Sequence, residues 1–128
     1  MLNNKKNYNS YKHELGKKGE NDVAKYLEIN NYYILIKNFY TYYGEIDIIA
    51  KDLIKNEYVF IEVKTRTTKE YGSPSDAVDT SKIKRIINSS RYFIYLNDLW
   101  NKKIRYDVAE VYVKDKGIFI NHIKNIIL

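Results

Sequence analysis

The length, composition and charge of this chain exclude several classes of protein and restrict the partners it can bind. With 128 residues it is long enough for one hydrophobic core but too short for two ordinary domains, and its 45% apolar content excludes a disordered protein. The absence of cysteine excludes disulfides and thiolate metal sites, while a net charge of +6 has the sign that a phosphate-rich partner requires.

Residues 1–9 are rich in Asn and Lys and show no apolar periodicity, which predicts a flexible N-terminal arm before a single domain over residues 10–128. The start has no apolar segment of the signal-peptide kind, and no later apolar run approaches the ~20 residues of a membrane span. We therefore expect a cytoplasmic protein without a membrane partner.

A first helix is predicted from Ser10, a residue type that caps helices, to the Asn30–Asn31 pair, which suits a helix end. The spacing of small and apolar residues defines one buried face, made of Gly16, Gly19, Glu20, Val23, Ala24 and Leu27. Glu20 carries a carboxylate within this stripe, so its side chain is expected to face the core.

Three strands are predicted next, over residues 32–39, 45–50 and 58–67, because these segments are rich in aromatic and β-branched residues. Gly44 separates the first two strands. The polar connection over residues 51–57 has the length of a hairpin loop, so three antiparallel strands in series are expected.

The second half of the chain contains a loop at residues 72–75, a helix over residues 80–96 and two strands over residues 105–113 and 118–123. The predicted buried face of this helix comprises Ile83, Ile86, Ile87, Ser90 and Ile94. A turn at residues 115–117 joins the last two strands. The element order is that of an α/β protein.

Charged residues interrupt two of the predicted strands. Glu62 and Lys64 are two residues apart, so their side chains share one face of a strand whose other face is apolar. Asp47 lies between isoleucines in the preceding strand. Charges are costly in such surroundings unless they are paired or bind a metal, so both strands are expected to carry a carboxylate with a specific role.

Two interpretations of these charges remain open. Asp47 or Glu62 can form a structural ion pair with Lys64, which is the common role of a Glu-x-Lys triplet. Alternatively, Asp47, Glu62 and Glu20 hold a hard divalent cation, for which Mg²⁺ fits best and Mn²⁺ can substitute. Lys64 would then orient a water or stabilise negative charge on a phosphodiester. Glu45 shares the strand face of Asp47, but its place near the strand end favours a surface ion pair, so it stays outside the predicted metal set.

Five segments form an ordered set of motifs: residues 16–20 (GKKGE), 44–50 (GEIDIIA), 59–66 (VFIEVKTR), 72–82 and 105–108 (RYDV). Together they resemble the YraN-like family of small bacterial proteins with a proposed endonuclease activity. That family is similar to archaeal Holliday-junction resolvases within the PD-(D/E)xK superfamily. The resemblance implies a restriction-endonuclease-like core, with a mixed sheet of about five strands and flanking helices.

The resemblance also implies functional roles. Glu20, Asp47 and Glu62 would be metal-site acids, and Lys64 would be the catalytic lysine. DNA would be the partner, and likeness to junction resolvases suggests a homodimer.

Candidate contacts to nucleic acid lie within the same motifs. Lys82 is near the start of the second helix, where a family lysine recurs, and it is expected either to contact phosphate or to be a solvated helix charge. The further candidates are Arg66, Lys17 and Lys18.

One segment departs from the family pattern. Between residues 38 and 44 the family usually carries arginines, whereas this chain has Tyr40, Tyr42 and Tyr43. Tyrosines can stack on bases, as in single-strand binding proteins. With 14 tyrosines in the chain, however, half-buried sheet positions are the more common role.

Three other polar residues are expected to be structural. His13 and His122 lie near opposite ends of the sequence, so a histidine relay is not indicated, and both are predicted to be surface or packing residues. Asp107 has an apolar context and is expected to pair with Arg105 or another neighbour.

The sequence therefore favours a metal-dependent endonuclease acting on DNA, including branched or structured DNA. The alternative is a non-catalytic nucleic-acid-binding module that keeps the nuclease fold. Carboxylates repel phosphate, so they are not expected on a surface that only binds nucleic acid. Their presence favours the enzyme over the binding module. An interaction domain without nucleic acid explains the basic balance but not the buried acids.

Overall fold

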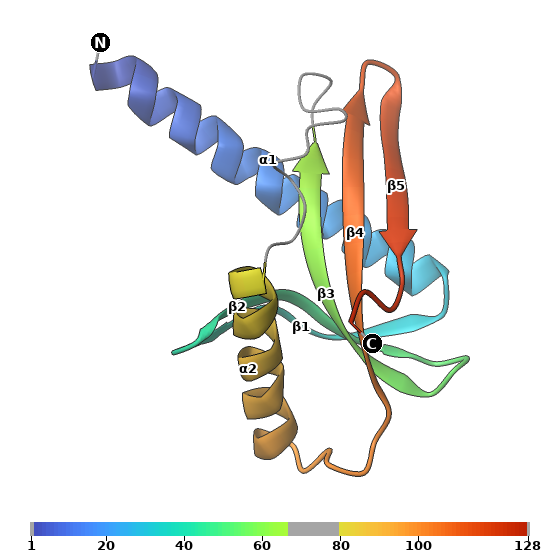
Figure 1. The fold of residues 1–128 in the computed structure, drawn as a ribbon. Coiled ribbons are helices and arrows are strands. Elements are labelled where there is room, and N and C mark those ends of the chain that lie inside the picture. The colour runs from blue at the N-terminus through green and yellow to red at the C-terminus, as the bar shows by residue number, and fades with distance from the viewer. Residues whose placement is uncertain (1, 67–79, 128) are drawn as a thin grey trace.

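A computed structural model of the chain describes residues 2–66 and 80–127, with side chains from residue 10 onward. These residues form an α/β fold with one five-stranded sheet (Figure 1). The elements are α1 (Leu2–Ile29), β1 (Tyr32–Thr41), β2 (Gly44–Asp52), β3 (Glu57–Arg66), α2 (Thr80–Leu96), β4 (Ile104–Lys114) and β5 (Gly117–Ile123).

The sheet is mixed, as the family resemblance implies. Its strand order is β1-β2-β3-β4-β5, and β1, β2 and β3 are antiparallel neighbours joined by short turns. β4 pairs parallel to β3 after the connection that contains α2, and β5 returns antiparallel to β4. A parallel pair needs such a crossover, because its second strand must start at the same end as the first.

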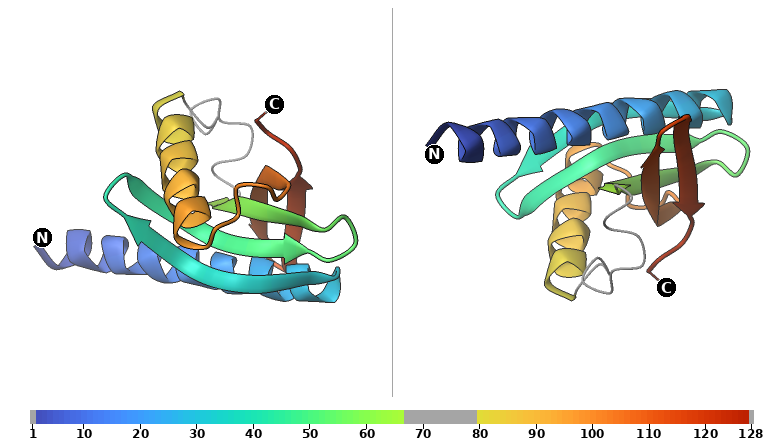
Figure 2. Two further views of the ribbon diagram at one scale, coloured as in Figure 1. Left: turned by 90° about the horizontal axis from the view of Figure 1, so that it is seen from below. Right: turned by 90° about the horizontal axis from the view of Figure 1, so that it is seen from above.

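The two helices cover opposite faces of the sheet (Figure 2). Residues of α1, including Val23 and Leu27, pack with Ile48 and Ile61 in one core cluster. On the other face, α2 packs over a second cluster, which comprises Ile46, Ile49, Phe60, Ile86, Phe93, Ile94, Leu99 and Tyr106. Each buried face therefore stabilises one helix against the sheet through removal of apolar surface from water.

The predicted element types are confirmed, and the bounds of α2 agree with the expected residues 80–96. Its buried face is rotated slightly from the prediction, since Ser89 and Phe93 are buried with Ile86, Ser90 and Ile94. The predicted loop at residues 72–75 lies outside the described residues. In residues 2–66 and 80–127, neither helix has an apolar stretch long enough to cross a membrane.

The start of α1 corrects one prediction. The helix begins at Leu2, not at Ser10, and its first turns extend beyond the sheet (Figure 1). Apolar periodicity marks only the part of a helix that packs, whereas polar residues without proline or glycine can continue the helix into solvent. Ser10 is therefore inside the helix, and the flexibility expected for residues 1–9 stays a prediction.

A buried polar network ties the strands together on the α1 face. Arg105 on β4 donates to Asp107 at 3.0 Å, to Asp52 at 3.0 Å and to the Tyr32 hydroxyl at 2.7 Å. His122 on β5 lies 2.7 Å from Asp107. Burial alone would raise the pKa of Asp107, but hydrogen bonds with His122 and Arg105 lower it overall. The structural roles predicted for Asp107 and His122 are confirmed.

Candidate metal and nucleic-acid site

The candidate site lies where β2 and β3 stop pairing. Their register runs from Asp52 opposite Glu57 to Ile48 opposite Ile61. Beyond that point, the backbone N–H of Val63 donates to Oδ2 of Asp47 at 2.8 Å. A buried N–H needs an acceptor, and here a carboxylate takes the role of a strand carbonyl. Asp47 is therefore fixed between the two strands.

Three carboxylates converge at this point. Glu20 on α1, Glu45 and Asp47 on β2 each offer one oxygen, and these oxygens lie within 4.8 Å of one another. The structure thus brings Glu20 and Asp47 together, as predicted. Glu45 joins them, against the expectation from its place near the strand end, because residues two apart in a strand share a face. We call Glu20, Glu45 and Asp47 the acidic cluster.

Burial, together with neighbouring negative charges, raises the pKa of each acid of the cluster. Burial raises the pKa of Asp47 to about 8, and the negative charges of Glu62 and the other acids add to the effect. The hydrogen bond from Val63 opposes the rise but does not cancel it. Burial, followed by the charge of Glu62, also raises the pKa of Glu45.

Oxygen-only donors crowded in this way match what Mg²⁺ and Mn²⁺ require. A divalent cation would replace the bound proton and balance the remaining negative charge. The residues present therefore fit a hard divalent cation.

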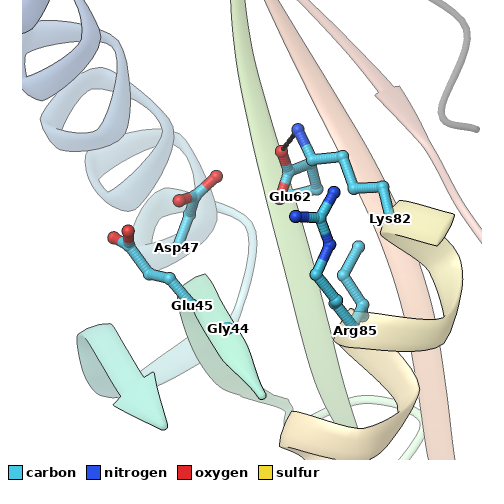
Figure 3. A pocket seen from close by; sticks show the side chains of 7 residues that line it. Gly44, Glu45, Asp47, Glu62, Lys82 and Arg85 are labelled. Carbon is cyan, nitrogen blue, oxygen red and sulfur yellow. Dashed lines mark ion pairs between the residues drawn. The ribbon is translucent and has the colours of Figure 1, made fainter. Parts of the chain in front are cut away.

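Glu62 and Lys64 occupy different surroundings. Glu62 on β3 is 9% exposed, and its carboxylate forms an ion pair with Lys82 on α2 (Figure 3). Lys64 is half-buried on the same strand face, in register with Glu110 of β4. The lysine that pairs with Glu62 is thus Lys82, which the sequence suggested as a phosphate contact. A pairing between elements so distant in the chain has no periodic signature in the sequence.

Two hollows meet at the acidic cluster, and both include Glu45 and Asp47. One of about 380 Å³ is lined by Gly44, Glu45, Asp47, Glu62, Lys82, Arg85 and Ile86 (Figure 3). The other, of about 270 Å³, is lined by Lys12, His13, Gly16, Lys17, Glu20, Asn38, Tyr40, Glu45 and Asp47. Basic residues of α2 thus border the acids in one hollow, and basic residues of α1 border them in the other.

The other residues predicted to contact nucleic acid lie in different surroundings. Lys17 lines the smaller hollow, whereas Lys18 is exposed and is not among the residues that line either one. Arg66 at the end of β3 donates to Glu110 of β4 at 2.6 Å, so its guanidinium forms an ion pair between these two strands. Arg85 and Lys12 line the hollows although the sequence did not single them out, since exposed helix charges are too common to be diagnostic.

Two backbone features position the acids. Gly19 lies so close to β3 that a Cβ atom there would be 2.1 Å from Oγ1 of Thr65, and this close approach brings Glu20 to the sheet. Asn38 has a φ of 58° within β1, and its side chain donates a hydrogen bond to Glu20. A left-handed asparagine inside a strand is uncommon, and no sequence pattern indicated it.

The comparisons with known proteins agree with this arrangement of motifs. The model of the "Uncharacterised protein family UPF0102" matches residues 19–111. A UPF0102 protein of Clostridium perfringens strain SM101 is 46% identical over 102 residues, 79% of this chain and 81% of that protein. One from Caldanaerobacter subterraneus subsp. tengcongensis is 41% identical over 117 residues, 89% and 94% of the two chains. One from Clostridioides difficile strain 630 is 44% identical over 112 residues, 88% and 95% of the two chains. The chain therefore belongs to the UPF0102 family, the YraN-like family that its motifs resemble.

Proposed function

We propose that this protein is a Mg²⁺-dependent endonuclease that hydrolyses phosphodiester bonds of DNA. The observation that carries the proposal is the acidic cluster at the divergence of β2 and β3, bordered in each hollow by basic residues. The acids suit a cation, and the flanking charges suit the phosphates on either side of the cut. The likeness of the family to PD-(D/E)xK nucleases supports the same chemistry.

The residues have distinct proposed roles. Glu20, Glu45 and Asp47 would hold the cation, which supplies positive charge to the scissile phosphate and acidifies a water. Glu62 on β3 lines the larger hollow together with Glu45 and Asp47, and we assign it to the same ligand set. Lys64 lies on the same strand face as Glu62, and its proposed role is to stabilise the negative charge that develops on the phosphate.

DNA is the proposed partner because the net charge of +6 and the cations of both hollows complement a phosphate backbone. Lys17 and Arg85 are assigned to backbone contacts. Likeness to junction resolvases extends the proposal to branched DNA and a homodimer, and these two points rest on family analogy. The proposed cytoplasmic location rests on the sequence pattern described above.

A non-catalytic nucleic-acid-binding module is the second candidate function. The ion pair of Glu62 with Lys82 favours it, because a structural pair at this position needs no cation. The crowding of the other three acids opposes it, since unneutralised carboxylates repel phosphate.

A cleavage screen over branched, single-stranded and duplex DNA tests the proposal. Cleavage should require Mg²⁺ or Mn²⁺, stop in excess chelator and fail with Ca²⁺, whose longer bonds and looser geometry do not align the reaction. Asp47→Asn should lower the rate by at least about 100-fold. Asp115→Asn, the same substitution at an exposed turn, should leave it unchanged.

Calorimetric titration with Mn²⁺ gives a readout that does not depend on activity. Asp47→Asn should weaken Mn²⁺ binding, whereas Asp115→Asn should not. Cleavage that persists in chelator, or a folded Asp47→Asn protein that cuts like the parent, would remove the proposed metal mechanism. Binding of DNA without cleavage of any substrate would support the binding module.

A further inference from the structure

Three tyrosines project from the hairpin between β1 and β2. Tyr40, Tyr42 and Tyr43 are 73%, 98% and 49% exposed. The rings of Tyr42 and Tyr43 meet edge to face, with centroids 5.6 Å apart. Half-buried positions, the more common role for tyrosine, therefore do not describe Tyr40 or Tyr42, while Tyr43 exposes about half of its surface. We call Tyr40, Tyr42 and Tyr43 the tyrosine platform.

The tyrosine platform borders the acidic cluster. Tyr40 is the direct cross-strand partner of Glu45, and both side chains line the smaller hollow. Directly opposed residues of antiparallel strands lie side by side on one face. The same hollow is lined by Lys12 and Lys17 from α1. One ring of the tyrosine platform, that of Tyr40, thus shares a hollow with two lysines and with the proposed metal ligands of the acidic cluster.

The hairpin that carries the platform is held in place. Oγ1 of Thr41 accepts hydrogen bonds from the backbone N–H groups of Tyr43 at 3.0 Å and Gly44 at 3.1 Å. The same oxygen lies 2.9 Å from the hydroxyl of Ser89, a buried residue of α2. The turn is therefore attached to the helix that supplies Arg85 to the larger hollow, and these contacts fix the backbone that carries Tyr42 and Tyr43.

We propose that the tyrosine platform stacks on unpaired bases, so that the site takes DNA with single-stranded nucleotides beside the scissile phosphate. The choice of cut site rests on the proposed nuclease function, whereas the binding of bases does not. Cations that track phosphates next to exposed aromatic rings are the arrangement by which proteins bind single strands. Bases within a duplex already stack on their neighbours and expose only their edges in the grooves. An uninterrupted duplex therefore offers no free base face on which the tyrosine rings can stack.

Binding of labelled oligonucleotides in Ca²⁺, measured by fluorescence anisotropy on the full chain, tests the proposal. Tyr40→Ala and Tyr42→Ala should each weaken binding of a single strand by about tenfold, the usual effect of losing one stacked base. Binding of duplex should change little. Tyr42→Phe should bind like the parent, because stacking uses the ring and not the hydroxyl. Tyr33→Ala, at an exposed position near the other end of β1, is the matched control and should have no effect.

Abasic nucleotides complete the test, because they keep the phosphate and remove the base. The parent protein should bind a strand with an abasic nucleotide at the platform about tenfold more weakly than the intact strand. The Tyr42→Ala protein should bind the abasic and intact strands equally, because the stacking contact is already lost. Equal affinity of parent and tyrosine variants for every DNA would overturn the proposal and point to a protein partner for these rings. So would abasic losses that are the same in parent and variant.

Cleavage assays separate this proposal from the nuclease proposal. A protein that binds unpaired bases through the tyrosines but cuts nothing would contradict the nuclease and keep the platform. A protein that cuts duplex as fast as a flap, with tyrosine variants unaffected, would contradict the platform and keep the nuclease.

Discussion

Asp47 is the residue on which the chemistry of the site depends most directly. Burial and neighbouring acids raise its pKa to about 8, so this carboxyl holds a proton at neutral pH, which the proposed cation would have to replace. We expect Mn²⁺ affinity to rise by about tenfold per pH unit from about pH 6 to near pH 8 and then to level off. Calorimetric titrations in two buffers of different ionisation enthalpy would measure the released proton. Affinity that does not vary with pH would contradict this assignment.

The same raised pKa has an effect on stability. Between about pH 4 and pH 8 the folded protein keeps a proton on Asp47 that the unfolded chain has lost, so the stability of the metal-free protein should fall as pH rises across this window. Asp47→Asn removes the effect. It should raise the free energy of unfolding at pH 8 by about one to a few kcal/mol, because a pKa difference of one between the folded and unfolded states corresponds to about 1.4 kcal/mol. At pH 4 the two proteins should be nearly equal.

Urea unfolding in chelator at both pH values measures this difference, with Asp115→Asn as the control. Equal destabilisation of Asp47→Asn at pH 4 and pH 8 would show that the carboxyl matters through its hydrogen bond with Val63 and not through its charge.

Sequence patterns located some site residues and missed others for a physical reason. Asp47 and Glu62 stand out because a charge in an apolar strand is costly, and Glu20 stands out because it interrupts a buried helical stripe. Glu45 is exposed and Asn38 is recognisable only by its backbone angle, so neither breaks a hydrophobic pattern. Convergence of residues from different elements depends on tertiary contacts, which periodicity does not encode.

At the scale of elements, periodicity placed the five strands and α2 to within a few residues. It did not predict that β2 and β3 separate past Ile48. The separation follows from contacts on both faces: Ile46 and Ile49 pack toward α2, whereas Ile48 packs toward α1. The alternation of side chains between the two faces of β2 is therefore broken at Asp47. A prediction that assumes a period of two along the strand does not reveal such a break.

The close packing of α1 on β3 at Gly19 can be tested by adding one methyl group. Gly19→Ala should destabilise the protein and lower cleavage, because the added methyl would collide with Thr65 and push Glu20 away from the acidic cluster. The control is Gly16→Ala, one turn earlier, where no atom lies within 4 Å of the added Cβ. That variant should be neutral or more stable by up to about 1 kcal/mol through helix propensity. Thermal unfolding and Mn²⁺ titration of both variants would measure the effects, and equal behaviour would contradict the close packing.

For the whole molecule, the distribution of charge is the informative feature. A net charge of +6 states only that cations are in excess, whereas the fold places basic residues of two helices beside one group of acids. The sequence could not supply this layout, because α1 and α2 are separated by three strands and meet around the site only in the folded sheet. A strand of DNA that crosses the acidic cluster would contact both sets of cations.

Salt dependence measures whether DNA uses both hollows at once. The affinity should fall steeply between about 50 and 200 mM salt, with a slope of roughly −0.7 to −0.9 per phosphate contact. Lys17→Gln and Arg85→Gln, one from each hollow, should each reduce the slope by about one contact, and the double variant by about two. Arg85 is preferred to Lys82 because loss of Lys82 would leave Glu62 without its ion pair. Lys55→Gln, at the exposed turn between β2 and β3, should leave the slope unchanged. If only one of the two hollow variants alters the slope, DNA enters from one side and does not span the acids.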